Sequence, residues 1–118
     1  MDYRIIKAPT LGTSSLLQRR IDPTLKVDVS QYEAIGLMQG KLCDMVLACD
    51  IAEKASGVNV FDIRGNCPQN LIMIAVLGDT ASVETALECV ALRIADQNKA
   101  FLRKGLEVWT WDLLVWQM

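Results

Sequence analysis

The sequence contains no histidine, and this absence narrows the chemistry that the chain can perform. Histidine is the commonest acid–base side chain at neutral pH and the usual partner of a nucleophilic serine or cysteine. No other arrangement of residues in the sequence has the look of a catalytic pair. We therefore expect the protein not to be an enzyme.

Long apolar runs and an excess of positive charge are also missing. No segment approaches the roughly 20 apolar residues of a membrane span, and the N-terminus lacks the apolar stretch of a secretory signal. A net charge of −2 and a pI near 5.0 provide no basic surface for nucleic acid or anionic lipid. We expect a cytoplasmic protein with neither a membrane nor a nucleic acid as its partner.

The four cysteines show no paired C-x-x-C spacing. In a reducing compartment, they are expected to be thiols or metal ligands rather than disulfides. Cys43, Cys49 and Cys89 fall within helical patterns, where a cysteine acts as a small hydrophobic residue. Cys67 lies outside any helical pattern and is the cysteine whose setting suggests another role.

What the sequence does contain is apolar residues, which make up 52% of its 118 positions, against 22% charged residues. A chain of this length forms one domain and buries roughly two thirds of its unfolded surface. Its apolar content exceeds what one small core can hide, so we expect the protein to self-associate.

The apolar patterns predict an α+β domain in the order β-α-β-α-β-β-α-β, with a mostly antiparallel, ferredoxin-like sheet and helices packed on one side of it. Gly36, inside a strand, is expected to mark a bulge or a close backbone approach. Gly105 is expected to end the third helix, before a strand with the three tryptophans. Strands are predicted over 3–8, 32–38, 58–63, 71–77 and 107–116, and helices over 13–21, 41–55 and 80–104.

The hexapeptide GNCPQN at 65–70 connects two of the predicted strands. Gly65 permits a tight turn, and Pro68 favours an extended conformation for the preceding Cys67. Gln69 and Asn70 place amide donors beside the thiol. The residues alone leave two readings open, in which Cys67 is either a soft metal ligand or a loop residue without a ligand.

Three segments of the sequence resemble the bacterial microcompartment (BMC) shell domain. They are EAIGLM at 33–38, DIAEKA at 50–55 and GDTASVETA at 78–86, and the resemblance covers residues 32–95. A strand–helix unit at 3–21 precedes this region, as in the circularly permuted shell proteins. The hexapeptide takes the place of the family's pore loop, and it resembles that of shell proteins from glycyl-radical-enzyme microcompartments, in which the pore cysteine binds an iron–sulfur cluster.

The resemblance implies a structural shell protein made of one permuted domain over 1–118. The parts of this domain would be a permuted unit and connector (1–32), a core (33–105) and a tryptophan-rich strand (106–118). Such proteins form cyclic homo-hexamers that tile with other shell proteins into the shell of a bacterial microcompartment. Lys54 would be the lysine at the edge between hexamers. The residues alone indicate only a solvated helix end, and the edge role comes from the resemblance. The pore would be ringed by Gly65, Asn66, Cys67, Pro68 and Gln69.

In such a ring, Cys67 from several copies could together hold an iron–sulfur cluster, as a 4Fe–4S cubane, which would serve electron transfer or redox sensing across the shell. Two alternatives remain at this point. The pore could be open to small metabolites with Cys67 merely lining it. The chain could also be a small ferredoxin-like regulatory domain that binds a ligand.

Overall fold

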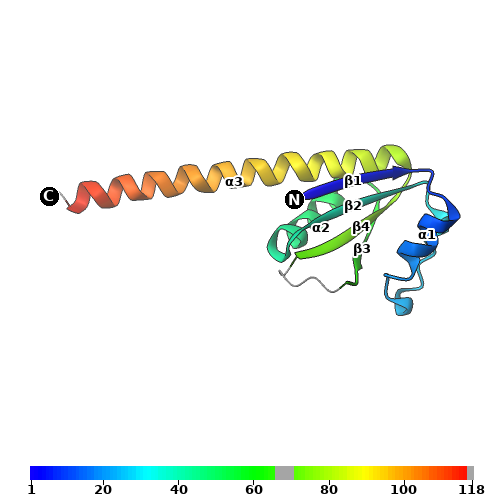
Figure 1. The fold of residues 1–118 in the computed structure, drawn as a ribbon. Helices are drawn as coiled ribbons and strands as arrows, with labels where there is room; N and C mark the ends of the chain where they lie inside the picture. Colours follow the sequence, from blue (N-terminus) through cyan, green and yellow to red (C-terminus); the bar gives the residue numbers. More distant parts are fainter. Residues whose placement is uncertain (66–70, 117–118) are drawn as a thin grey trace.

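The computed structural model describes the chain over residues 1–65 and 71–116, and the side chains over 1–65 and 71–104 (Figure 1). The predicted order of elements is confirmed as far as the third helix. The strands are β1 (Asp2–Lys7), β2 (Ala34–Lys41), β3 (Asn59–Ile63) and β4 (Leu71–Gly78). The helices are α1 (Leu11–Gln18), α2 (Leu42–Ala55) and α3 (Thr80–Trp116).

The four strands form one antiparallel sheet in the order β1-β2-β4-β3. Lys41 at the end of β2 pairs with Leu71 at the start of β4, and Ala34 pairs with Gly78 at the opposite end of the sheet. The antiparallel sheet predicted from the sequence is therefore confirmed, and β1 is part of it.

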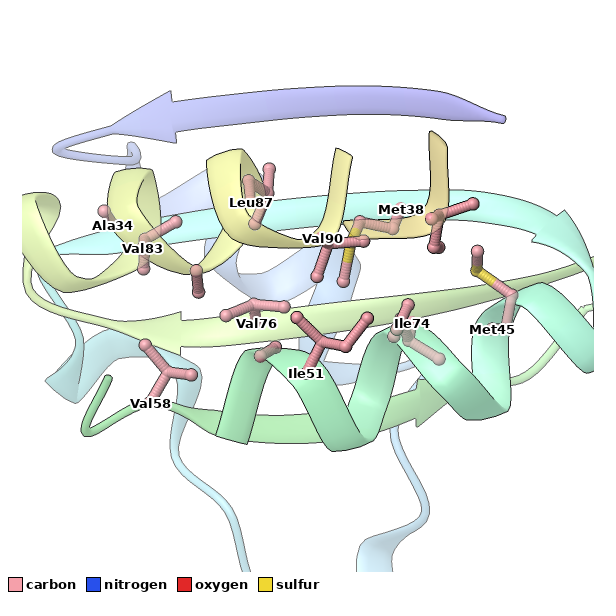
Figure 2. Close-up of a cluster of buried hydrophobic side chains, with 14 residues drawn as sticks. Ala34, Met38, Met45, Ile51, Val58, Ile74, Val76, Val83, Leu87 and Val90 are labelled. Atoms are coloured by element: carbon pink, nitrogen blue, oxygen red, sulfur yellow. The ribbon is translucent and has the colours of Figure 1, made fainter. Parts of the chain in front are cut away.

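The helices α2 and α3 cover one face of the sheet, where the larger cluster of buried side chains lies (Figure 2). Gly36 in β2 lies close against α3, since a Cβ at this position would come within 2.7 Å of Leu87 Cδ1. Gly36 keeps its regular partners in β1 and β4, so its predicted role is confirmed as a close approach rather than a bulge. The labelled members of the cluster are Ala34, Met38, Met45, Ile51, Val58, Ile74, Val76, Val83, Leu87 and Val90.

The helix α1 and the two short 3₁₀ turns after it cover the opposite face, so the prediction that all helices lie on one side is wrong. Ile35, Ala75 and Leu77 alternate with the residues of the first cluster and pack there with Ile21 and Val29. The central strands β2 and β4 are apolar on both faces, and each face must therefore be covered.

The connection between α1 and β2 is held by the half-buried side chain of Gln18. Its amide nitrogen donates to the Val27 carbonyl at 2.8 Å, and its amide oxygen accepts from the Val29 N–H, also at 2.8 Å. The predicted connector thus contains two short turns, Pro23–Leu25 and Val29–Gln31, and hydrogen bonds from Gln18 fix it to the end of α1.

The tail of the chain differs from its prediction, because α3 continues through Gly105 to Trp116 where a strand was expected over 106–118. The alternating apolar residues of this tail also fit a helical spacing of three and four, and a short apolar run does not distinguish the two. A glycine within a helix costs only about 1 kcal/mol relative to alanine, so the helix can continue past Gly105. Ile94 is the last buried residue of α3 up to Lys104, and the helix then projects beyond the sheet (Figure 1).

Candidate pore segment between β3 and β4

The pairing of β3 with β4 places the two ends of the hexapeptide at one end of the sheet. Ile63 pairs with Met73, and the neighbouring pair of Lys41 with Leu71 closes the same end. Gly65 is exposed, and a Cβ built there would meet no atom within 4 Å. The other predicted pore residues, Asn66, Cys67, Pro68 and Gln69, lie outside the described residues.

Arg64 fixes the start of this segment to the chain that follows α1. Its backbone N–H donates to the Arg20 carbonyl at 2.9 Å, and its Nη2 donates to the Ile21 carbonyl at 3.3 Å. These bonds hold the end of β3 against the segment after α1, which covers the second face of the sheet. This anchor could not be predicted from sequence patterns, because the residues it joins are more than 40 positions apart.

A groove of about 460 Å³ lies beside Gly65, between α1 and the sheet. Its walls are mostly apolar, and its polar side chains include two arginines and a glutamine. The groove therefore brings α1 and both strands that flank the hexapeptide to one concave surface. Residues that line it include Leu16, Arg20, Leu37, Gln39, Ile63, Arg64, Leu71 and Met73.

The three cysteines that the structure describes are not alike. Cys49 and Cys89 are half-buried and pack against the larger core cluster, as predicted for small hydrophobic residues. Cys43 also lies on α2, as predicted, but its side chain is exposed. Burial, together with the nearby Glu53 and Asp50 carboxylates, raises the pKa of the Cys49 thiol, which disfavours the thiolate needed for metal ligation.

No group of three potential metal ligands occurs among the side chains of residues 1–65 and 71–104. A cluster would therefore need thiolates from the hexapeptide, where Cys67 is the sole cysteine of the sequence between Cys49 and Cys89. One thiolate per chain fits an iron–sulfur cluster only when several copies share it, since such clusters are held by three or four cysteines. The donor chemistry thus fits an assembly and does not fit a single chain.

Lys54 lies in the last turn of α2, with its side chain 71% exposed. Its Nζ is 2.8 Å from Asp50 Oδ2, a pairing four residues apart along the helix. The side chain is accessible to a neighbouring molecule. Within the described chain, the surface ion pair with Asp50 is enough to explain its position. Its role at an edge between hexamers remains a prediction.

The family model for the BMC domain matches residues 34–104, from β2 into the projecting part of α3. The strand β1 and the helix α1 precede the match, although β1 belongs to the same sheet. No protein with a curated description matches the chain.

Solved structures of microcompartment shell proteins are similar to this chain. The ligand-free GrpU shell protein from Clostridiales bacterium 1_7_47FAA is 47% identical, with a TM-score of 0.59 over 77% of this chain and 88% of that one. The ligand-free GrpU shell protein from Pectobacterium wasabiae is 30% identical, with a TM-score of 0.62 over 76% of this chain and 99% of that one. The trimeric shell protein PduB shares the fold. It is 21% identical, with a TM-score of 0.52 over 81% of this chain and 41% of that one.

These findings replace the alternative of a regulatory ligand-binding domain, and they support a structural role rather than a catalytic one. The chain belongs to the BMC domain family of bacterial microcompartment shell proteins.

Proposed function

We propose that copies of this chain assemble into a cyclic hexamer of the microcompartment shell, with residues 65–69 of each copy around a central pore. The observation that supports this arrangement most is the end of the sheet at which β3 stops and β4 starts. Gly65 is exposed there, and no described atom lies within 4 Å of a Cβ built on it. We therefore place the hexapeptides of the six copies around the axis at this end of the sheet.

The strand–helix unit at the N-terminus supports a circular permutation of the family domain. β1 pairs along its whole length with β2, from Asp2 opposite Gln39 to Lys7 opposite Ala34. This unit precedes the family match and still completes one edge of the sheet. A last unit moved to the front of the chain has this appearance.

The pore is proposed to hold an iron–sulfur cluster through Cys67. A six-fold ring contains a three-fold axis, and a 4Fe–4S cubane has three-fold axes along its body diagonals. Alternate copies can therefore present three thiolates to three irons. When bound, the cluster would supply one-electron transfer or redox sensing across the shell.

The contribution of this chain is to hold the thiolates at one level. The bonds from Arg64 to the carbonyls of Arg20 and Ile21 fix where the hexapeptide begins, and the pair of Lys41 with Leu71 fixes where it ends. Asn66, Gln69 and Asn70 carry amide N–H groups that can donate to cluster sulfurs, and such donors tune a cluster's potential.

Iron, acid-labile sulfide and visible absorption of anaerobically purified protein test the ligand assignment. The wild type is expected to be brown with broad blue absorption, and Cys67→Ser is expected to lose both the colour and the iron. Cys43→Ser is the matched control, since Cys43 is exposed but lies on α2. A colourless wild-type hexamer would instead support an open metabolite pore, and a Cys67→Ser variant with full iron would overturn the assignment.

A further inference from the structure

The projecting part of α3 carries an apolar seam on the side turned away from the sheet. Leu92 and Leu102 are 68% and 70% exposed, whereas Val90 and Ile94 are buried. Each residue advances about 100° around an α-helix, so Leu92 lies about 200° from both Val90 and Ile94. The seam that starts at Leu92 therefore lies nearly opposite the buried stripe.

The seam continues along α3 with alternating steps of three and four residues. This alternation is the heptad pattern of a coiled coil, in which positions a and d face a partner helix. Lys99 is the polar exception, and a single polar residue at position a restricts the pairing register. The a positions are Leu92, Lys99, Leu106 and Leu113, and the d positions are Ala95, Leu102, Trp109 and Trp116.

Between Ala95 and Lys104, this part of α3 has no support from the body of its own chain. All residues from Ala95 to Lys104 are exposed, and the helix from 95 to 116 spans about 33 Å at 1.5 Å per residue. In proteins, most of the stability of a helix comes from tertiary packing of its apolar face. A partner helix with the same spacing would supply that packing.

Two charged residues beside the seam indicate the orientation of this partner. Asp96 and Arg103 both occupy heptad position e and are exposed. Position e faces position e of an antiparallel partner, whereas it faces position g of a parallel one. In a parallel pair, Asp96 and Arg103 would meet the uncharged Ala91 and Asn98.

In an antiparallel pair, one register satisfies both charges. With Ala95 opposite Leu106, Asp96 of each copy faces Arg103 of the other. A shift by one heptad in either direction brings Asp96 against Asp96 or Arg103 against Arg103. Like charges across such a seam are unfavourable and exclude wrong registers.

We propose that α3 of one copy pairs antiparallel with α3 of a second copy through this seam. The pairing is isologous and lies on a two-fold axis. If the proposed hexamer forms, its six projecting helices cannot all pair within the ring, because the three opposed pairs would cross at one point on the axis. The second copy therefore belongs to another ring, and the seam joins two rings.

Sedimentation analysis of the number of chains tests the pairing. A variant that stops after Lys104 keeps every described buried residue, and we expect its particle to contain half as many chains as that of the wild type. This ratio does not depend on the cluster or on how many chains the truncated particle contains. The number of chains in the truncated particle is a separate test of the proposed hexamer. An unchanged number of chains after truncation would overturn the pairing. Binding of the wild type to phosphatidylcholine vesicles would then assign the seam to a lipid surface instead of a second copy.

Charge variants test the orientation. Asp96→Arg or Arg103→Asp alone places like charges together and is expected to halve the number of chains at moderate salt. The double variant with both changes restores opposite charges and is expected to recover the wild-type number. Arg93→Asp, an exposed change on α3 outside the seam, is the control and is expected to have no effect. Single variants that behave as the wild type, or a double variant that stays halved, would contradict the antiparallel pair.

Discussion

Gly36 of β2 lies directly beneath Leu87 of α3, so close that a single added carbon would stand 2.7 Å from Leu87 Cδ1 and 2.9 Å from Val83 Cγ1. Both neighbours are fully or nearly fully buried and belong to the core cluster between α3 and the sheet. The position of α3 on the sheet thus depends on the absence of a side chain at residue 36.

Gly36→Ala is expected to lower the free energy of unfolding by about 1–3 kcal/mol, the usual cost of overpacking a core. Urea denaturation of the two proteins measures this difference. Gly57→Ala is the control, because nothing lies within 4 Å of its added carbon. A Gly36→Ala variant as stable as the wild type would mean that α3 can move away from β2 at no cost.

Gln18→Ala is expected to destabilise the protein by about 1–3 kcal/mol, because it leaves the buried Val29 N–H without its acceptor. Thermal and urea denaturation measure this loss. Gln31→Ala removes an exposed glutamine with one bond of 3.3 Å to Asp28 and is expected to change stability by at most about 0.5 kcal/mol. Equal effects of the two changes would argue against the bridging role of Gln18.

Asp79 is expected to contribute to the acid sensitivity of the fold. Its Oδ1 accepts from the Ser82 N–H at 2.8 Å at the start of α3, and this hydrogen bond lowers the pKa of the carboxyl below 3.8. Because the folded pKa is the lower one, the stabilisation is present above the unfolded value and is lost as the pH falls through the folded value.

Asp79→Asn keeps an acceptor at this cap but removes the titration. We expect the variant to be close to the wild type in stability at neutral pH and to lose less stability below pH 3.8. Chemical denaturation across this pH range makes the comparison. A variant with the same acid profile as the wild type would assign the acid sensitivity to other carboxylates, such as Asp22 and Asp28, whose pKa values are also lowered by hydrogen bonds from their own turns.

Lys54→Ala is expected to leave the proposed hexamer and its stability nearly unchanged. It is expected to prevent hexamers from assembling edge to edge into larger flat layers, called hexamer sheets below. The ion pair with Asp50 is largely exposed and contributes at most about 0.5 kcal/mol. Light scattering and electron microscopy follow the hexamer sheets. Lys7→Ala, which breaks the exposed pair with Glu84, is the matched control and is expected to assemble normally. Normal hexamer sheets from Lys54→Ala would remove Lys54 from the edge.

The sequence was most informative where short apolar runs are bounded by glycine or polar residues, as in β3 and β4, and where a helical stripe is bounded by glycine, as in α2. Gly36 also signalled its close contact correctly. The covering of the second sheet face was harder to predict from the sequence, because α1 contributes little apolar surface by itself and the anchor of Arg64 joins distant residues.

The tail was predicted wrongly because Trp109, Trp111 and Leu113 satisfy a two-residue alternation as well as parts of a helical spacing. Only the continuation from Thr80 as one helix decides between them. The candidate pore could be predicted as a connection between two strands. How copies would meet at the proposed pore depends on contacts between chains, which the sequence pattern of one chain does not predict.

Native mass spectrometry of anaerobically purified protein tests the central proposal most directly, since one spectrum counts both chains and cluster. We expect six chains, or a multiple of six, with the added mass of one 4Fe–4S cluster per ring in the wild type and of none in Cys67→Ser. A particle that never contains a multiple of six chains, or a cluster that persists in Cys67→Ser, would contradict it.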